Sequence, residues 1–392
     1  MATEYKKYIP ALRFPEFQND GEWSMLELGK FAKIVMGQSP SSEAYNERGE
    51  GVPLLQGNAD IKDRHQVVRV YTTDITKTCD INDIIMTVRA PVGTISRASF
   101  KSCIGRGVCA IKTDSEYLYQ YLISIEQEWD KLASGSTFVS ITSNQIFDRI
   151  IVVPLTIQEQ KKIADCLSSL DKYIDATKRK LELLKKHKKG LMQRLFPAKG
   201  KTTPELRFPE FKNDGEWVEK KVRNIFDQIT RGCVLPVSET RQSPDDTYKY
   251  PVYSSQTANN GLMGYYNKFL YKNAITWTTD GANAGTVMLR RGEFFCTNVC
   301  GVLISHRGYA NGCISEIIAT HAKEHVSYVG NPKLMNNVMG EIEICIPPTI
   351  DEQIKIADCL YKVDQIISSH EKKIKSLELH KRGLIQQLFP KL

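Results

Sequence analysis

The chain has 392 residues, of which 41% are hydrophobic and 25% charged, a balance typical of a soluble folded protein with two or three domains. This composition excludes wholesale disorder, and the lack of any run of about 18 apolar residues argues against a membrane-spanning helix. The net charge of +8 favours a polyanionic partner. The start of the chain lacks the apolar segment of a secretory signal, so we expect a cytoplasmic protein.

Two short motifs near the start of the chain recur after its middle. The motif LRFPEF occupies residues 12–17 and again residues 206–211. The motif NDGEW occupies residues 19–23 and again residues 213–217, also at an offset of 194 residues. Such a repeat indicates that the chain is a duplicated half-protein.

A longer block, residues 154–197, matches residues 347–390 at an offset of 193 residues, whereas the segments that precede the two copies differ in sequence. The repeated frames therefore enclose two dissimilar inserts, residues 24–153 and 218–346. We divide the chain into a first frame with its insert (1–153), a first helix (154–197), a second frame with its insert (198–346) and a second helix (347–392).

Both inserts contain short runs of β-branched or aromatic residues separated by Gly, Pro, Asn and Asp, which is typical of strands and turns. Each insert is therefore expected to be a compact α+β domain. We expect strands at residues 83–89, 107–111, 274–277, 285–289 and 299–304, and one amphipathic helix at residues 116–132.

The repeated blocks predict two long helices. Each block opens with a proline and a T-x-x-E capping box, Thr156 to Glu159 and Thr349 to Glu352, and each helix is expected to end at a proline. Apolar residues then recur at alternating spacings of three and four, the pattern of a coiled-coil seam. The residues expected to pair the helices are Leu167, Leu170, Ile174, Leu181, Leu184, Leu191, Leu360, Val363, Ile367, Ile374, Leu377 and Leu384.

Polar residues interrupt both seams at equivalent places, which constrains how the helices pair. If the helices are antiparallel, matching polar residues with polar ones predicts Thr177 opposite Lys381 and Lys188 opposite His370. The alternative register gives longer overlap but places Thr177 opposite Ile367. We favour the first register because a polar layer can fix the alignment of a coiled coil.

The sequence contains no recognisable catalytic motif. Residues 200–202 read GKT but lack the upstream glycine of a phosphate-binding loop. Cys296, Cys300, His306 and Cys313 lack the paired spacing of a zinc site, and the ten cysteines are expected to be reduced thiols. We therefore expect a non-catalytic chain that binds no metal or cofactor itself; the enzyme-class alternative is a nuclease or metalloenzyme that uses the cysteines.

Loops rich in Asn, Gln, Ser and Thr are the candidate nucleic-acid contacts, because such side chains can read base edges, and nearby cations can bind phosphate or guanine. The alternative explanation is ordinary turns and surface cations. The candidates are Gln56, Asn58, Arg64, Arg89 and Arg106 in the first insert, and Ser254, Ser255, Gln256, Thr257, Asn259, Asn260, Arg290, Arg291 and Lys333 in the second. The basic stretch at residues 178–201 is a further candidate for phosphate contact, although we prefer a solvated helix face or a seat for an acidic partner.

Several of these features together resemble the DNA-specificity subunit of type I restriction–modification systems. They are the repeated LRFPEF frames, the helix openings at residues 154–160 and 347–353, and the segments GSTF (135–138) and GNPKL (330–334). The resemblance covers nearly the whole chain. It implies an α+β fold with two globular target-recognition domains, separated by two long conserved helices packed as an antiparallel coiled coil in a pseudo-twofold repeat.

The resemblance also implies a function and partners. Each target-recognition domain would read one half of a split double-stranded DNA sequence, and the helices would dock two adenine-N6 methyltransferase subunits. Two restriction or translocase subunits would join for cleavage, and S-adenosylmethionine, ATP and Mg would belong to the partner subunits. The alternative is a stand-alone DNA-binding regulator with two heads; Tyr173, Ile366 and Leu379, apolar residues off the seam, favour protein partners instead.

Overall fold

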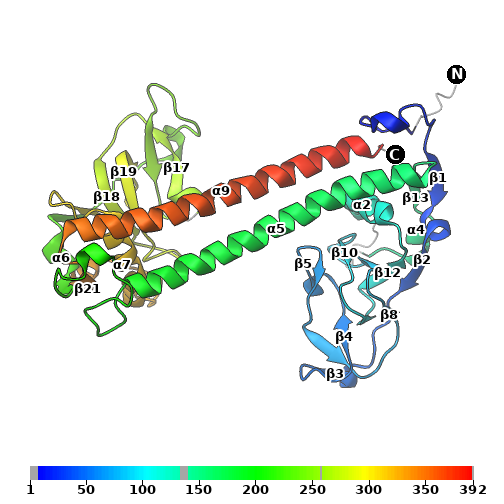
Figure 1. Cartoon of the computed structure of the whole chain (residues 1–392), viewed down its shortest axis with the longest axis horizontal. Helices are drawn as coiled ribbons and strands as arrows, with labels where there is room; N and C mark the ends of the chain where they lie inside the picture. Colours follow the sequence, from blue (N-terminus) through cyan, green and yellow to red (C-terminus); the bar gives the residue numbers. More distant parts are fainter. Residues whose placement is uncertain (1–7, 133–139, 257, 391–392) are drawn as a thin grey trace. The chain divides into compact units, whose positions relative to one another are not determined.

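The computed structural model describes residues 8–132, 140–256 and 258–390. The chain forms two compact units: unit 1 is Met1–Lys178 together with Lys372–Leu392, and unit 2 is Arg179–Glu371. Each unit contains one insert and about half of each long helix (Figure 1). The GSTF segment at residues 135–138 lies outside the described residues.

The insert of unit 1 is built from two sheets. The first has the strand order β2-β12-β9-β10-β6-β5, and the second has the order β3-β7-β4-β11-β8. The strands are β2 (Lys33–Met36), β3 (Tyr45–Asn46), β4 (Val52–Leu55), β5 (Ile61–Lys62), β6 (His65–Gln66), β7 (Val70–Thr72), β8 (Thr78–Cys79), β9 (Ile84–Thr87), β10 (Ile95–Arg97), β11 (Ser102–Ile104) and β12 (Val108–Lys112). The helices are α1 (Leu28–Phe31), α2 (Glu116–Ser124), α3 (Trp129–Leu132) and α4 (Ser143–Phe147), and β1 (Ser24–Glu27) pairs with β13 (Ile150–Val153) to close the insert.

The insert of unit 2 has one six-stranded sheet in the order β15-β20-β18-β19-β16-β17. Its strands are β15 (Gln228–Arg231), β16 (Tyr250–Tyr253), β17 (Leu262–Tyr266), β18 (Tyr271–Thr278), β19 (Val287–Cys296) and β20 (Cys300–Ile304). The helices are α6 (Val222–Ile225), α7 (Gly312–Ala322) and α8 (Asn336–Glu341), and β14 (Val218–Lys221) pairs with β21 (Glu343–Ile346).

The two inserts share one framework although their sequences differ. Strand β12 runs antiparallel to β2 and β9, and β20 runs antiparallel to β15 and β18 in the same order. A helix follows in both, and each starts at a capping side chain: Ser115 accepts from the Leu118 N–H, and Asn311 accepts from the Ile314 N–H. The predicted α+β fold of the inserts is confirmed.

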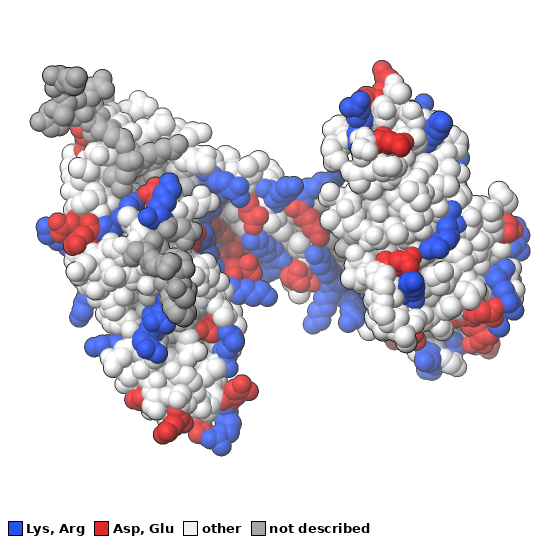
Figure 2. Space-filling model, turned by 180° about the vertical axis from the view of Figure 1, so that it is seen from behind, with Lys and Arg blue, Asp and Glu red and all other residues white. Residues whose placement is uncertain are grey.

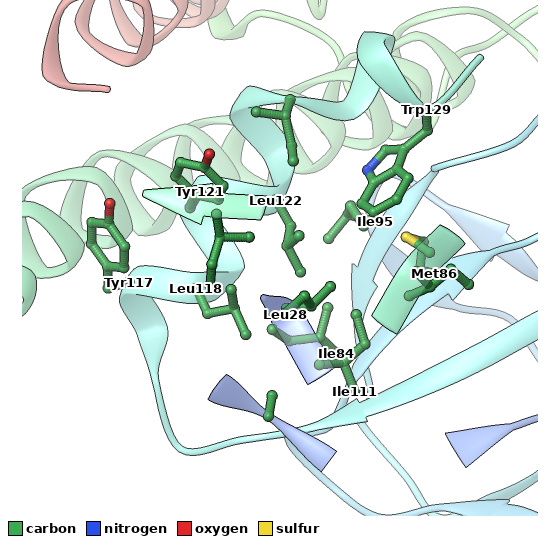
Figure 3. Packing of buried hydrophobic residues seen from close by; sticks show 14 of the residues in the cluster. Leu28, Ile84, Met86, Ile95, Ile111, Tyr117, Leu118, Tyr121, Leu122 and Trp129 are labelled. Atoms are coloured by element: carbon green, nitrogen blue, oxygen red, sulfur yellow. The ribbon is translucent and has the colours of Figure 1, made fainter. Parts of the chain in front are cut away.

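The core of unit 1 lies between these sheets and helices. Leu28, Ile84, Ile111, Leu118 and Leu122 are fully buried in one cluster, which Trp129 and Met86 extend (Figure 3). Because every one of these side chains is removed from water, the cluster stabilises the insert mainly by apolar burial, at about 1.5–3 kcal/mol for each large aliphatic side chain.

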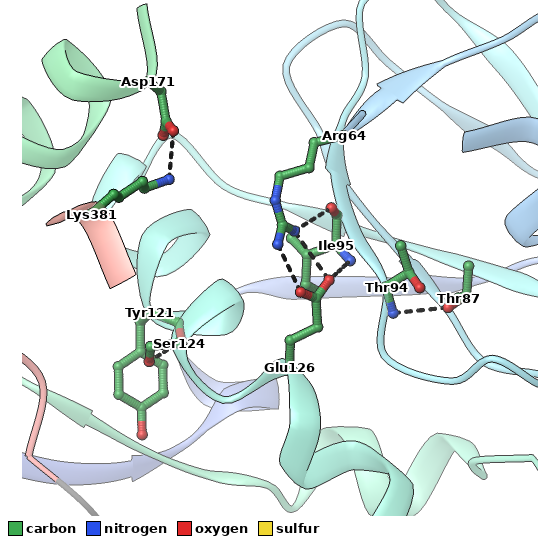
Figure 4. A network of polar contacts seen from close by, with 9 residues as sticks. All are labelled: Arg64, Thr87, Thr94, Ile95, Tyr121, Ser124, Glu126, Asp171 and Lys381. Carbon is green, nitrogen blue, oxygen red and sulfur yellow. Dashed lines mark hydrogen bonds and ion pairs between the residues drawn. The ribbon is translucent and has the colours of Figure 1, made fainter. Parts of the chain in front are cut away.

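Most strands lie where the sequence predicts them. Strands β9, β12, β18 and β20 confirm four of the five predictions, and the predicted strand at 285–289 is the first part of the longer β19. The single helix predicted at 116–132 is wrong: it breaks into α2, a 3-10 turn at Glu126–Glu128, and α3. The break places the carboxylate of Glu126 where it accepts hydrogen bonds from the Ile95 N–H and from Arg64 (Figure 4).

The two long helices are confirmed as α5 (Ile157–Leu195) and α9 (Ile350–Leu388). Their predicted capping boxes form only in half. Thr156 Oγ1 accepts from the Glu159 N–H at 3.3 Å, and Thr349 Oγ1 accepts from the Glu352 N–H at 3.3 Å. Neither glutamate returns the bond, because both carboxylates bind an arginine and a tryptophan of the LRFPEF–NDGEW frames.

In unit 1, the helices pair antiparallel through α5 residues before 179 and α9 residues after 371. Leu167 lies in the same cluster as Leu388 and Leu384. Lys381 Nζ donates to Asp171 at 2.5 Å (Figure 4), and Lys178 pairs with Glu378 at 2.7 Å.

Unit 2 repeats this arrangement with equivalent residues. Lys188 Nζ donates to Asp364 at 2.9 Å and to Glu316 of α7 at 3.0 Å, and Lys185 pairs with Glu371 at 3.0 Å. Burial opposes the charge of Lys188, but its hydrogen bonds and Coulombic attraction to the two acids together raise its pKa.

The predicted helix register is therefore wrong, since these ion pairs match neither register considered from the sequence. Thr177 does not need a polar partner across the seam because its hydroxyl donates to Tyr173 O at 2.7 Å in its own helix. His370 likewise bonds Ile366 O at 2.9 Å. The two seam lysines reach acids beside the seam instead, since their long side chains carry the ammonium group away from the apolar layer.

Candidate nucleic-acid interface

In unit 1, the loops that follow β2, β4 and β9 meet the turn at residues 105–108, at the edge of the sheet where β2 and β9 end and β12 begins. We call this edge the turn edge of the insert. The Gly105 N–H donates to Leu55 O at 2.7 Å, and the Val88 N–H donates to Gly107 O at 2.9 Å. A Cβ on Gly107 would lie 2.0 Å from Gln56 O, so only glycine allows the strands to approach this closely.

Four of the predicted contact residues lie at this edge. Gln56, Arg89 and Arg106 are exposed, and Asn58 is half-buried. The carboxylate of buried Asp60 accepts from the N–H groups of Gln56 at 2.7 Å and Gly57 at 3.2 Å, which fixes the loop backbone and leaves the Gln56 side chain outside.

Arg64, the fifth predicted residue of this insert, is occupied within the fold. Its guanidinium donates to Glu126 Oε2 at 2.7 Å and to Ile95 O at 2.9 Å (Figure 4). Burial opposes the charge, but the hydrogen bonds and attraction from Glu126 leave the pKa of Arg64 raised. Arg64 therefore joins β10 to the 3-10 turn at Glu126–Glu128.

Unit 2 has a turn edge with the same construction. The Thr297 N–H donates to Tyr253 O at 2.9 Å, and Thr297 Oγ1 bonds Ser254 Oγ at 3.1 Å. Ser255 O accepts from Asn283 Nδ2 at 3.0 Å. Lys333 is exposed at the same edge, where its backbone bridges to Asp280. Predicted residues Ser254, Ser255 and Lys333 thus come together.

The rest of the predicted polar loop forms a tight turn beside this edge. Asn259 and Asn260 adopt left-handed backbone angles, with φ of 50° and 55°, and their side chains are exposed. Gln256 is also exposed, and its amide bonds Leu262 O. Thr257 lies outside the described residues.

Arg290 is buried under this loop and holds it by a hydrogen bond to its backbone. It is only 7% exposed, its Nη1 donates to Asn260 O at 2.7 Å, and its Nε donates to Thr276 Oγ1 at 3.0 Å. The guanidinium lies 3.7 Å from the centroid of the Tyr253 ring. Burial lowers the pKa of Arg290. Arg290 therefore fixes the shape of the loop, whereas its neighbour Arg291 is exposed and lies over the Tyr361 ring of α9.

The structure brings two further residues to these edges that the sequence prediction missed. Ser39, after β2, accepts from Arg106 Nε at 3.2 Å. Asn298 is exposed in the turn that precedes β20. One available signal was position: Asn298 stands directly before the strand predicted at 299–304, just as Arg106 stands directly before the strand predicted at 107–111.

The basic stretch at residues 178–201 is neutralised in part, since four of its ten Lys and Arg side chains pair with acids. Lys178, Lys185 and Lys188 pair with acids of α9 or α7, and Arg194 pairs with Glu205 at 3.0 Å. Figure 2 accordingly shows Lys and Arg beside Asp and Glu on the visible helix surface. These four cations are better placed to hold the fold than to contact phosphates.

A groove of about 1310 Å³ lies within unit 2, between the end of α5 and the insert. Its wall combines apolar side chains with basic and acidic ones, including Met192, Phe196, Ile317, Lys189 and Glu343. Apolar residues off the helix seam are also exposed: Tyr173 at 46%, Ile366 at 46% and Leu379 at 66%. A groove lined in part by apolar side chains is typical of a binding site, whereas singly exposed apolar residues are common on protein surfaces.

The described residues contain neither a group of three or more His, Cys, Asp or Glu side chains able to hold a metal, nor a helix long and apolar enough to cross a membrane. The cysteines considered for zinc are buried among apolar neighbours. Burial raises the pKa of Cys300 to about 11, so this thiol is protonated at neutral pH.

The geometry defines a class of protein: a duplicated chain with two α+β recognition inserts on one framework, each presenting a polar turn edge, and two long helices shared between the units. The chain belongs to the type I restriction–modification DNA specificity family, whose domain model matches residues 20–186 and 214–379. This confirms both the family resemblance and the fold class predicted from the sequence.

Individual relatives agree. The putative type I restriction enzyme MjaX specificity subunit of Methanocaldococcus jannaschii is 39% identical over 186 residues, which are 45% of this chain and 43% of the relative. A putative type I specificity subunit of Mycoplasma pneumoniae is 32% identical over 169 residues, covering 42% of this chain and 54% of the relative. The matches thus span about half the length of these relatives.

A solved structure shares the fold over nearly its whole length. The crystal structure of a type I restriction–modification system S subunit from M. genitalium matches with a TM-score of 0.71 and covers 98% of this chain and 99% of the other. The sequence identity is 18%, so this likeness concerns the fold alone.

Proposed function

We propose that this chain is the non-catalytic, DNA-reading subunit of a type I restriction–modification complex, and that each insert reads one half of a bipartite double-stranded target. The observation that carries the proposal is the recurrence of the turn edge. Two inserts with dissimilar sequences keep the same hydrogen-bonded edge but present different polar side chains on it. A constant scaffold with variable exposed donors and acceptors is what two different readers require.

Two readers in one chain favour a target made of two unlike halves. A protein with two related modules binds two half-sites whose separation follows from its own geometry. Because the inserts differ in sequence, the halves would differ too, and the target would be asymmetric. Exposed Arg89, Arg106 and Lys333 add positive charge to the two edges, which supports contact with the polyanionic duplex.

Catalysis on this account belongs to partner subunits. Two adenine-N6 methyltransferase subunits would dock on the exposed apolar residues of α5 and α9 and on the groove of unit 2, and two restriction or translocase subunits would join them. S-adenosylmethionine, ATP and Mg would be bound by those subunits, and the target adenine would be flipped into the methyltransferase pocket. We place this assembly in the cytoplasm, where the DNA is.

Mapping methylated adenines by long-read sequencing tests the proposal. Cells that carry the cognate methyltransferase subunit with and without this chain would be compared, in a strain with no other adenine methylation. With the chain, we expect methylation in a motif of two defined parts separated by a fixed gap; without it, none. Methylation that is independent of the chain, or a single uninterrupted motif, would contradict the proposal. A stand-alone regulator would bind DNA but leave the methylation map unchanged.

A further inference from the structure

The turn that precedes β12 and the turn that precedes β20 have the same backbone connections. The Val108 N–H donates to Gly105 O at 3.1 Å, and the Cys300 N–H donates to Thr297 O at 2.9 Å, so each is a four-residue turn. The first interior residue of the two turns is Arg106 in unit 1 and Asn298 in unit 2.

Three further bonds fix both turns in the same surroundings. The first residue of each turn donates its N–H to the carbonyl at the end of β4 or β16. The third residue accepts from the N–H of the residue after β9 or β18, and the fourth accepts from the N–H of the glycine that follows the edge strand, β2 or β15. In unit 1 these bonds are Gly105 to Leu55, Val88 to Gly107 and Gly37 to Val108; in unit 2 they are Thr297 to Tyr253, Thr279 to Val299 and Gly232 to Cys300, all between 2.7 and 3.0 Å. Arg106 and Asn298 therefore occupy the same position on two scaffolds of unlike sequence.

Both side chains are free to contact a ligand. Arg106 is exposed and uses Nε to bond Ser39 Oγ at 3.2 Å, while its two Nη groups have no hydrogen bond to any residue that the structure describes. Asn298 is exposed, and its amide has no hydrogen-bond partner within residues 8–132, 140–256 and 258–390. The bond to Ser39 orients the guanidinium and leaves its outer edge open.

The chemistry of these two side chains differs in a way that matters for DNA. The fork of an arginine matches O6 and N7 of guanine, and the amide of an asparagine matches N6 and N7 of adenine. Both side chains can also donate to a phosphate oxygen, but such a contact carries no sequence information and would not require a different residue type in each insert. Polar loops flank both positions, with Gln56 beside the first turn and Ser254 beside the second.

We propose that Arg106 and Asn298 are equivalent specificity-determining residues, Arg106 reading a guanine in one half-site and Asn298 reading an adenine in the other. This inference rests on the proposed function and assigns the residues that would carry it. Each residue acts on one half-site, because each belongs to a different insert.

The test uses the complex assembled with its methyltransferase and competition binding against duplexes in which each base pair of the target is varied. Arg106→Gln should lower discrimination at one guanine of one half-site by about 5- to 150-fold, the range for one bidentate contact. Asn298→Ala should do the same at one adenine of the other half-site. Lys30→Gln, which removes an exposed cation on α1 of unit 1 that pairs with Glu27, is the matched control and should change neither.

Arg106→Lys separates base reading from phosphate contact. If Arg106 reads guanine, lysine cannot restore the bidentate contact, and discrimination stays low at that base pair. Equal weakening on all sequences, rescue by lysine, or effects on both half-sites would overturn the inference. Unchanged melting temperatures show that the variants are folded, and wild-type binding without sequence preference would mark failure of the proposed function itself.

Discussion

Arg13 and Glu159 form a buried, bidentate ion pair that joins the first LRFPEF motif to the start of α5. Arg13 Nε and Nη2 donate to the two carboxylate oxygens at 2.7 and 2.8 Å, and Trp23 Nε1 donates to the same carboxylate at 3.3 Å. Arg207, Trp217 and Glu352 repeat this arrangement at the start of α9, with both arginine bonds at 2.7 Å. The arrangement explains why the motif and the T-x-x-E sequence recur together.

Breaking this pair should destabilise unit 1 specifically. The side chains of Arg13 and Glu159 are 6% and 1% exposed, so Arg13→Ala leaves a buried carboxylate without its cation, at an expected cost of about 3–5 kcal/mol in the free energy of unfolding. Hydrogen exchange should rise in peptides of unit 1 and not of unit 2. Lys30→Ala, which removes an exposed pair with Glu27, should cost less than about 1 kcal/mol. Equal effects of the two variants would show that the buried pair does not hold the frame.

Arg290 and Arg291 are adjacent in sequence but should respond differently to replacement by methionine. Arg290→Met leaves Asn260 O and Thr276 Oγ1 without their donor and should cost about 1–3 kcal/mol. Because the loop at residues 258–261 then loses its support, recognition of the half-site read by the second insert should weaken. Arg291→Met should leave both properties nearly unchanged. Comparable losses in unfolding measurements and in half-site binding for the two variants would contradict this assignment.

Thiol labelling should distinguish the cysteines by burial. Burial raises the pKa of Cys109 to about 12, so this thiol remains protonated and unreactive in the native protein. Cys233 is exposed beside the turn edge of unit 2, where its N–H donates to Cys296 O at 3.1 Å. We expect mass spectrometry to find Cys233 alkylated well before Cys109, and cognate DNA to slow the labelling of Cys233. Equal rates for Cys109 and Cys233 in the folded chain would show that the core is open.

The helices and frames could be predicted because their signals are local or repeated. Proline, a capping threonine and an apolar repeat fix α5 and α9 to within a residue or two at each end. The register in which α5 and α9 pair could not be predicted from local or repeated signals. It depends on Asp171 and Asp364, which lie beside the seam and have no periodic signal, and on Thr177 satisfying its hydroxyl within its own helix.

The shared framework of the two inserts could also not be predicted from the sequence. It is made by backbone hydrogen bonds between distant segments, such as Gly105 to Leu55 and Thr297 to Tyr253, and a single glycine requirement such as that at Gly107 does not show which segments pair. By residue type alone, Arg64, Arg290 and Arg106 are equally good candidates for DNA contact. Only their partners, Glu126 for Arg64 and Asn260 for Arg290, separate the cations that support the fold from one that is free to contact a ligand.

Lengthening both long helices together should widen the gap between the half-sites. The boundary between the units falls after Lys178 in α5 and after Glu371 in α9. Four residues inserted after each add about one helical turn, or 6 Å, and should lengthen the gap by about two base pairs without changing either half. Inserting four residues in α5 alone should lower stability, because the two helices would no longer match in length. A changed half-site with an unchanged gap would show that the helices do not set the spacing.

The most direct test of the account replaces residues 24–153 with the corresponding insert of another family member and maps methylated adenines in cells that carry the cognate methyltransferase. If each insert is an independent reader on a common framework, one half of the methylated motif should change, while the other half and the gap should remain as they are. A motif in which both halves change together, or neither does, would contradict the claim that this chain reads its target through two separate inserts.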